Sequence, residues 1–420
     1  MARVASAQMY QRPELVVDKS ILSRDVVKFR PTVPGTFASG AVTDISFSLP
    51  RSGIWLDRMD TVRLQFSAIP TSVGGTYVRF SQYIWNLFDR LEITQSGHTI
   101  VNQRFFSDKM NSEYLINGDP NSQMGRLLWG EGSQAERNTL GAASNMYDFP
   151  IEIFRHLSAD NDIHVLPLSE LSGPLEVRLF FANPAACVEC DGTTPGFTIT
   201  NPRFVAQQII PSSSQRAAMV SDITAGKYRF GIVEATGYQY TMVSGSTAYN
   251  IPINVTRLSV RDIAWFMRTA STLLTTTTND RHITYNWNSL STAQYHIEGV
   301  LIPSENVSYG ATNFVDGFHS TMASAFEPRA LDWIPRARSL ITAANYVNDA
   351  LVVAQDFKRN SMQPWVVSGR STTNGSNIQV DVTLSGALGA NQTVSIFVYS
   401  DAILSITPQG DLFMLTGGGA

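Results

Sequence analysis

Hydrophobic and polar residues alternate with a period of two along much of the chain. In residues 61–67, for example, Val62, Leu64 and Phe66 fall on one side and polar residues on the other. A period of two places successive side chains on opposite faces of a β-strand, so each such segment buries one face only. Strands of this kind must pair into sheets, and the sheets must stack on one another to cover their apolar faces. The pattern therefore predicts an all-β protein.

Turn and helix signals interrupt the alternation. Residues 90–101 contain two alternating runs on either side of Gly97, which predicts a hairpin whose turn uses the positive φ that glycine tolerates. Short helices are predicted over residues 107–115, from Ser304 towards residue 310, and over residues 312–325. Because these segments lie between strands, we expect them to be loop helices on a β framework.

The first 35 residues form a segment with a different pattern. Leu15, Leu22, Val26 and Phe29 fall on one helical stripe, and Pro13 suits a helix start, so an N-terminal helical arm is predicted. Its acidic residues are outnumbered by six basic ones: Arg3, Arg12, Lys19, Arg24, Lys28 and Arg30. The arm is either docked on the body of the protein or in contact with an anionic surface, namely lipid head groups or genome.

A weak internal repeat suggests two copies of one all-β unit. Residues 174–205 share a layout with residues 392–413, and residues 56–66 share one with residues 258–266. Both pairs are offset by roughly 200 residues, as expected for a duplication. The predicted organisation is an arm (1–35), a first unit (36–222), a second unit (223–416) and a flexible tail (417–420).

Composition narrows the classes of protein. Only 16% of the 420 residues are charged, against about 25% in average proteins, and only five of the 31 basic residues are lysine. A hydrophobic content of 43% and a net charge of -4 exclude a disordered chain. We find neither an apolar membrane span nor the apolar core of a signal peptide. Low charge and a preference for arginine are typical of large protein interfaces, and a compositional bias of the source genome explains them equally well.

The sequence contains no recognisable catalytic pattern. No two of its six histidines are four residues apart, and there is no nucleophile elbow or phosphate-binding loop, so we expect no enzyme, no cofactor and no metal site. Cys187 and Cys190 form the one C-x-x-C motif, in a predicted loop. Two free thiols, a local disulfide, or a metal shared between subunits all fit that motif. Four glycosylation sequons, at Asn254, Asn306, Asn374 and Asn391, are interpreted as chance matches.

The layout of strands resembles that of the double jelly-roll major capsid proteins of icosahedral viruses, many of which enclose a membrane. The resemblance covers most of residues 40–415 and is one of layout rather than of a diagnostic motif. It is carried by residues 84–93 and 96–100 (an early strand pair with its glycine turn), 166–171 and 175–179 (the approach to the last strands of the first barrel), 302–325 (a loop helix of the second) and 394–406 (its closing strands).

The resemblance implies two tandem eight-stranded jelly-roll sandwiches in one chain. It also implies a structural major capsid protein that self-assembles as pseudo-hexagonal homotrimers tiling an icosahedral shell, located in the virion. Its partners would be copies of itself, minor capsid or vertex proteins, and a viral membrane or the genome at the N-terminal arm, with no small-molecule substrate.

Two other functions are compatible with a β-sandwich. A carbohydrate- or receptor-binding spike or lectin would use tryptophans as stacking platforms, and the chain has seven: Trp55, Trp85, Trp129, Trp265, Trp287, Trp333 and Trp365. A glycoside hydrolase would need two carboxylates about 5–10 Å apart in a cleft, and no feature of the sequence indicates such a pair.

Overall fold

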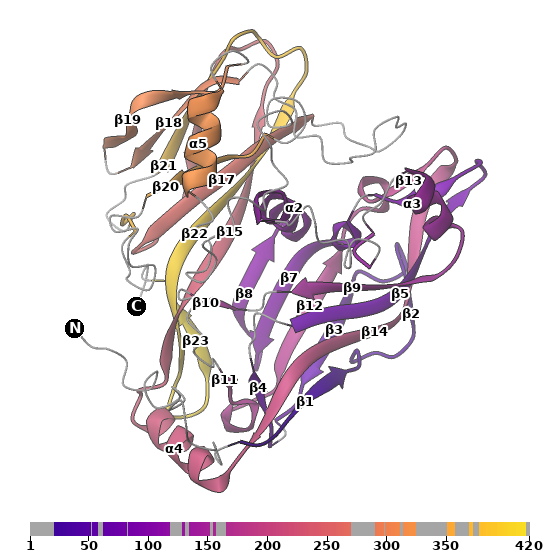
Figure 1. Ribbon diagram of the computed structural model, residues 1–420, viewed down its shortest axis with the longest axis vertical. Helices are drawn as coiled ribbons and strands as arrows, with labels where there is room; N and C mark the ends of the chain where they lie inside the picture. Colours follow the sequence, from indigo (N-terminus) through magenta and orange to yellow (C-terminus); the bar gives the residue numbers. More distant parts are fainter. Residues whose placement is uncertain are drawn as a thin grey trace. The chain divides into compact units, whose positions relative to one another are not determined.

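A computed structural model of the chain describes residues 21–51, 53–57, 62–81, 83–117, 128–130, 134–151, 154–156, 165–269, 290–297, 299–310, 314–324, 351–357, 369–372 and 378–416. Strands dominate these residues (Figure 1), which confirms the all-β prediction. The chain divides into two compact units that interleave in sequence. Unit 1 comprises Met1–Gln103, Arg126–Val233 and Ala402–Leu415, and unit 2 comprises Arg104–Gly125, Glu234–Asp401 and Thr416–Ala420. The domain boundaries predicted from the sequence stay a prediction.

Unit 1 contains two main antiparallel sheets. Among the described residues, one sheet has the order β11 (Val165–Leu166), β4 (Trp55–Asp57), β14 (Thr193–Pro211), β5 (Val62–Val73) and β9 (Asn145–Ile151), with β1 (Ile21–Phe29) and β2 (Thr36–Ala38) also paired to β14. The second has the order β3 (Asp44–Leu49), β12 (Leu175–Phe181), β7 (Phe88–Gln95) and β8 (His98–Arg104). A smaller ribbon pairs β6 (Val78–Phe80) with β13 (Val188–Cys190).

Aromatic side chains join the two main sheets of unit 1. Phe66 on β5 packs edge-on against Phe88 on β7, with ring centroids 5.9 Å apart. Phe47 on β3 lies 5.8 Å from Phe204 on β14. All four rings are buried, as the alternation of β5 predicts for its apolar face. Short 3₁₀ turns complete the unit: η2 (Ile84–Leu87), η3 (Leu168–Glu170) and η4 (Pro184–Ala186).

The remaining strands form two further sheets. A four-stranded sheet in unit 2 has the order β16 (Ala248–Ile253), β21 (Ile378–Leu384), β18 (Leu290–Ile297) and β19 (Val300–Ser308). The other has the order β10 (Arg155–His156), β15 (Arg229–Met242), β22 (Gln392–Ile406), β17 (Val260–Thr269) and β20 (Val353–Asp356), with β23 (Leu412–Leu415) paired to β22. In unit 2, Trp265 of β17 donates its indole N–H to the hydroxyl of Tyr295 on β18 at 2.9 Å. Burial raises the pKa of Tyr295, so this core hydroxyl stays neutral.

The two jelly rolls repeat one strand order. In the first, β1-β14-β5-β9 faces β3-β12-β7-β8, and in the second, β15-β22-β17-β20 stands with β16-β21-β18-β19. Each set has eight strands, and each strand of the first has one counterpart in the second, which confirms two tandem eight-stranded jelly rolls among the described residues. Pairing residues 56–66 with 258–266 is confirmed, since β5 matches β17. The predicted pairing of residues 174–205 with residues 392–413 is displaced by one strand. It aligned β12 with β22, whereas the strand order matches β12 with β21 and β14 with β22.

Four α-helices lie in the described residues: α2 (Phe106–Asn117), α3 (Gln134–Gly141), α4 (Ser213–Thr224) and α5 (Val315–Ser324). Helices α2 and α5 confirm two predictions, and they follow the equivalent strands β8 and β19. The helix predicted from Ser304 is wrong, because that segment is part of β19. The sequence analysis did not predict α3 or α4, although Ser212 accepts the backbone N–H of Gln215 as an N-cap.

The predicted N-terminal helical arm is wrong for residues 21–29. Residues 21–29 form strand β1, which pairs with β14 in antiparallel register, Phe29 opposite Phe204. The apolar stripe that suggested a helix does not form one face of this strand, because Phe29 is buried between the sheets whereas Val26, on the opposite face, is 51% exposed. Residues 1–20 lie outside the described residues.

Candidate functional site

Strand β1 carries the described part of the predicted anion-contact set. Arg24 and Lys28 lie on β1, Arg30 follows it, and all three are exposed. Arg24 and Lys28 are four positions apart, so they share the face of β1 opposite to Phe29. Arg3, Arg12 and Lys19 lie outside the described residues.

The sheet extends this basic face beyond the predicted residues. Lys28 and Arg63 of β5 are both register partners of Val205 on β14, so they occupy one row on the same face. The Arg63 side chain is 49% exposed and forms an ion pair with Asp148 at 3.2 Å. The sequence analysis missed Arg63, although its position between the inward-facing Val62 and Leu64 already places it outward.

The outer face of the sheet β3-β12-β7-β8 is charged and aromatic. The guanidinium of Arg90 lies 3.7 Å from the centroid of the Phe180 ring, and that of Arg178 lies 5.0 Å from it. Arg178 also forms an ion pair with Asp44 at 3.2 Å. Arginine stacked on an aromatic ring is partly desolvated and is common in protein interfaces. This charged face is therefore a candidate contact surface.

The equivalent face of unit 2 has different chemistry. On β16-β21-β18-β19 the positions that are not buried include amides, a histidine and the carboxylate of Asp381, with His296 2.6 Å from Asp381. Gln379 donates to the same carboxylate, and Gln294 donates to the Pro303 carbonyl at 2.9 Å. This amide-rich face has the topology of the charged face of unit 1 but little of its charge.

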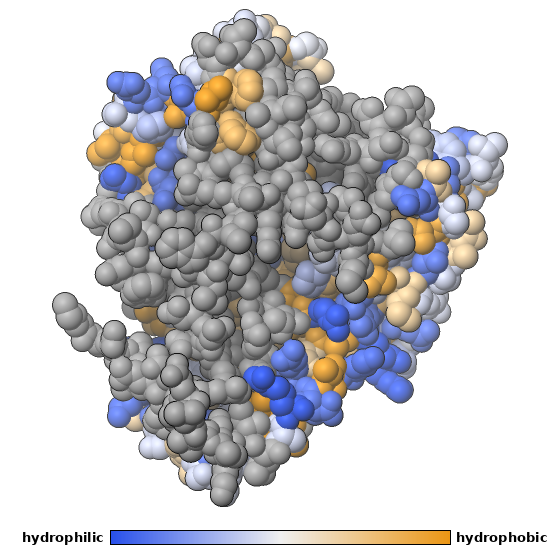
Figure 2. Space-filling view, viewed as in Figure 1, coloured by the Kyte–Doolittle hydropathy of each residue, from blue (hydrophilic) through white to orange (hydrophobic). Residues whose placement is uncertain are grey.

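The outermost strand of that sheet adds exposed apolar residues. Val300 and Leu301 at the start of β19 are 48% and 40% exposed, and Val315 at the start of α5 is 51% exposed. Orange and blue side chains lie next to one another at the upper left of Figure 2, where Figure 1 places β18, β19 and α5. Exposed apolar side chains on an outermost strand and the helix after it are available to a partner, so they mark a second candidate contact surface.

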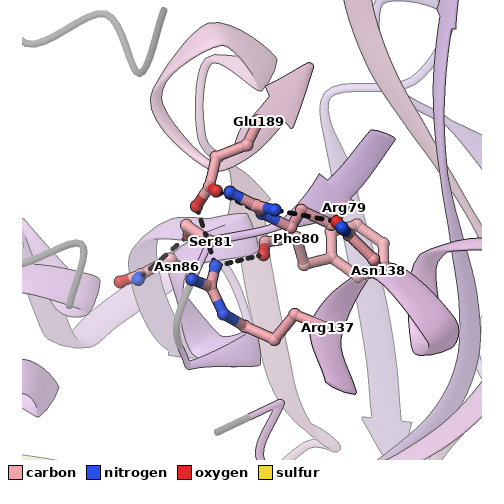
Figure 3. Close-up of polar contacts among 7 residues, drawn as sticks. All are labelled: Arg79, Phe80, Ser81, Asn86, Arg137, Asn138 and Glu189. Atoms are coloured by element: carbon pink, nitrogen blue, oxygen red, sulfur yellow. Dashed lines mark hydrogen bonds and ion pairs between the residues drawn. The ribbon is translucent and has the colours of Figure 1, made fainter. Parts of the chain in front are cut away.

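A buried ionic cluster fixes the ribbon β6–β13 (Figure 3). Glu189 accepts a hydrogen bond from Arg79 at 2.5 Å and one from Arg137 of α3 at 2.9 Å. Arg79 also donates to the side chain of Asn138 at 2.8 Å, and Arg137 donates to the Phe80 carbonyl. The three charged side chains are 0–2% exposed. The cluster holds α3 on the ribbon, and all of these contacts are made within unit 1, so we interpret it as structural.

The neighbouring loop is held by a second carboxylate. Asp191 accepts hydrogen bonds from the Thr76 hydroxyl, the Tyr77 N–H and the Thr76 N–H. These bonds, the hydroxyl first, lower the pKa of Asp191 to about 2. Gly75 approaches so closely that a Cβ there would lie 2.4 Å from the Asp191 side chain, which explains the glycine.

The C-x-x-C motif begins in the turn before β13 and ends on that strand. Cys190 is part of β13, and Cys187 precedes the strand, so the predicted loop placement is wrong for Cys190. Both cysteines are free thiols and buried. Burial raises the pKa of Cys187, which leaves its thiol protonated and unreactive.

The described residues offer little to the alternative functions. Trp55, Trp85 and Trp265 are at most 1% exposed, so they are core residues and not stacking platforms. No group of three or more potential metal ligands occurs in the described part of the chain. Within the same residues, no helix has the length and apolar character to span a lipid bilayer. The sequon residues Asn254, Asn306 and Asn391 are exposed, and Asn374 lies outside the described ranges.

Comparisons with known proteins identify the fold. No protein-family model matches the chain, and no curated protein matches it. Solved structures do match: VP54 of PBCV-1, as fitted into a reconstruction of the virophage Sputnik, has 12% identity and a TM-score of 0.63, covering 96% of this chain and 98% of that one. A chain of the PBCV-1 virus capsid has 14% identity and a TM-score of 0.61, with the same coverages. The Faustovirus major capsid protein has 10% identity and a TM-score of 0.55, covering 94% of this chain and 92% of its own. The chain therefore has the double jelly-roll fold of viral major capsid proteins.

Proposed function

We propose that this chain is the structural major capsid protein of an icosahedral virion and acts by self-association rather than by catalysis. The observation that carries the proposal is the match over nearly the full length of both chains to a chain of the PBCV-1 capsid and to the Faustovirus major capsid protein. A fold that is shared by proteins of unrelated function is weak evidence for any one function. A duplicated jelly roll that matches capsid proteins over nearly its full length is stronger evidence for a capsid role. The location of the protein would be the virion shell.

Surface chemistry supports self-association. The exposed apolar residues Val300 and Leu301 and the Arg–Phe180 stack are both typical of subunit contacts. We propose homotrimers in which three chains supply six jelly rolls to a pseudo-hexagonal capsomer. Minor capsid or vertex proteins would be further partners. Interfaces of this obligate kind bury about 2,000–5,000 Å².

The experiment that tests this function is a mass measurement on the purified full-length chain. Mass photometry over a dilution series should give a species of three times the 46.2 kDa chain mass, and electron microscopy at high concentration should reveal closed shells. A strict monomer at all concentrations would contradict the proposal, more so if the protein bound a glycan array. Substituting Val300 and Leu301 with Asp should shift the distribution to monomers, and Val73→Asp, at an exposed residue of unit 1, is the matched control.

The basic face of β1 is proposed to contact an anionic surface inside the shell, either a viral membrane or the genome. Its residues are Arg24, Lys28 and Arg30, together with Arg3, Arg12 and Lys19. Deleting residues 1–30 would be a poor test, because it removes β1 and the buried Phe29. Charge reversal of the three described cations leaves the strand in place.

Two ligands separate the outcomes of that test. Vesicles containing anionic phospholipid and a random single-stranded DNA are offered to the reversed and wild-type proteins at low and high salt. Loss of vesicle binding alone supports a membrane contact, and loss of DNA binding alone supports a genome contact. Wild-type protein that binds neither, or reversed protein that binds both normally, would refute the contact.

A further inference from the structure

Each compact unit contains a segment from the other half of the sequence. Unit 2 includes Arg104–Gly125, which interrupts the unit 1 sequence, and unit 1 includes Ala402–Leu415 from near the C-terminus. The first segment carries α2, and the second carries the end of β22 together with β23.

Helix α2 is fixed in unit 2 by buried polar contacts. Asp108 accepts hydrogen bonds from Ser395 of β22 at 2.9 Å and from Arg268 of β17 at 3.1 Å. One turn later, Glu113 accepts the hydroxyl of Tyr399 on β22 at 3.0 Å. Both carboxylates are less than 10% exposed. A buried carboxylate without such partners is costly, so the surface of β17 and β22 is specific for this helix.

Helix α5 shows that a helix at this point of the repeat can also bind strands from its own half of the sequence. It follows β19 as α2 follows β8, at the equivalent point of the repeat. Its Thr321 hydroxyl donates to the Val352 carbonyl at 3.2 Å and accepts the Ala354 N–H of β20 at 3.3 Å. Helix α5 thus binds strands of its own half of the sequence, whereas α2 binds strands that begin more than a hundred residues later.

The C-terminal hairpin is held in unit 1 by several hydrogen bonds, and Gln95 makes two of them. Gln95, at the end of β7 and 2% exposed, donates to the Gly410 carbonyl at 3.1 Å and accepts the Leu412 N–H at 2.6 Å. The Ser172 N–H donates to the same Gly410 carbonyl at 2.8 Å. A Cβ on Gly410 would lie 2.7 Å from this Ser172 nitrogen, so the turn approaches unit 1 as closely as glycine permits.

We infer that the two jelly rolls are built by reciprocal exchange: the N-terminal half supplies α2 to the second jelly roll, and the C-terminal half supplies Ala402–Leu415, the end of β22 with β23, to the first. Each half of the sequence is then the specific binding partner of the other. It follows that the peptide connection between them is not required once the protein has folded.

A protease site placed in the full-length protein between Ala225 and Gly226, in the turn after α4, tests this inference. Ala225 is exposed, and cleavage there separates the halves without entering either exchanged segment. After cleavage of the folded protein, the two fragments should remain one species in native mass spectrometry and size-exclusion chromatography. Fragments that separate without denaturant would overturn the inference.

Variants show whether the exchanged segments carry the association. Gln95→Leu with Asp108→Ala in the cleaved protein should weaken the association of the halves roughly tenfold to hundredfold for each site, since each site loses at least two hydrogen bonds. Gln294→Leu is the matched control, because it removes a glutamine–carbonyl bond whose two partners lie in the same half. An equal response of the test and control variants would overturn the inference.

Hydrogen exchange of the cleaved wild-type protein gives an answer without any substitution. The amides of α2 should remain as protected after cleavage as those of β18, a core strand of unit 2. Selective loss of protection in α2 on cleavage would show that the helix is held by the chain connection alone, contrary to the inference.

Discussion

Removing Glu189 from the ionic cluster of β6 and β13 should destabilise unit 1 strongly. In Glu189→Ala, Arg79 and Arg137 keep their charges at positions that are 0% and 2% exposed, while the carboxylate that both bind is lost. Neither guanidinium can be neutralised by losing a proton at accessible pH. The variant must therefore either bury uncompensated charge or open the ribbon to water.

The structure sets the size of the effect. Glu189 accepts hydrogen bonds from two arginines, each worth about 1.5–3 kcal/mol when a charged group is involved. Breaking a buried pair by removing one partner costs about 3–5 kcal/mol in other proteins, which is the range expected here. Replacing all three members together, as Arg79→Met, Arg137→Met and Glu189→Leu, should recover most of this loss, because no charge is then left buried.

Hydrogen exchange measured by mass spectrometry resolves the effect by region. Amides of β6 and β13 should exchange roughly 150- to 5,000-fold faster in Glu189→Ala, the equivalent of about 3–5 kcal/mol. Peptides from β18 and β21 in unit 2 should not change. Glu176→Ala, at an exposed position on β12, is the matched control and should stay within about 0.5 kcal/mol of wild type.

Two results would refute this reasoning. One is a Glu189→Ala protein within about 1 kcal/mol of wild type, which would mean that the arginines find other partners at little cost. The other is a triple variant that is less stable than Glu189→Ala. That result would mean that the interactions in the cluster stabilise the fold by more than the cost of burying its charges.

Three further predictions concern unit 1. Phe66→Ala should cost about 3–5 kcal/mol in urea unfolding, since Phe66 packs against three buried rings, whereas Val73→Ala on the same strand should cost little. Burial raises the pKa of Tyr147 to about 12. As pH rises from 10 to 12, the free energy of unfolding of wild type should therefore fall by up to about 2–3 kcal/mol relative to that of Tyr147→Phe. Parallel curves of unfolding free energy against alkaline pH for the two proteins would contradict this. Because the pKa of Asp191 is lowered to about 2, its stabilising contribution is present above pH 4 and is lost on acidification towards pH 2. Acid unfolding of Asp191→Asn should lack that part of the slope.

The sequence predicted those features that depend on local periodicity. The alternation around Leu64 specified a strand with one buried face, and Gly97 specified the β7–β8 turn, where its φ is 82°. The helical spacing of residues 312–325 predicted α5 because four apolar positions fell on one side. Each of these patterns reports its own element without information from the rest of the chain.

Features that depend on distant partners were missed or misassigned. Strand β1 was predicted as a helix because Leu22, Val26 and Phe29 fit a helical stripe, whereas its conformation is set by pairing with β14, some 180 residues away. Glu189 binds Arg79 from 110 positions later, and no local signal links them. The partners of α2 on β17 and β22 are more distant still. Long-range pairing of this kind cannot be read from a single sequence that carries no record of covariation.

The unequal outer faces of the two jelly rolls have a consequence for any ring of these subunits. The strand orders are the same, but one face carries Arg90, Arg178 and Phe180, and its counterpart carries Gln294, His296 and Gln379. In the proposed capsomer, six jelly rolls of similar fold would form a ring. Fold alone would then not distinguish a correctly placed chain from one rotated by 60° about the ring axis. The charged face of the first jelly roll and the amide-rich face of the second would alternate around such a ring. A misplaced chain would bring two jelly rolls of the same kind next to each other. If the proposed homotrimer forms, the chemical difference between the two halves would favour the correct arrangement of its subunits.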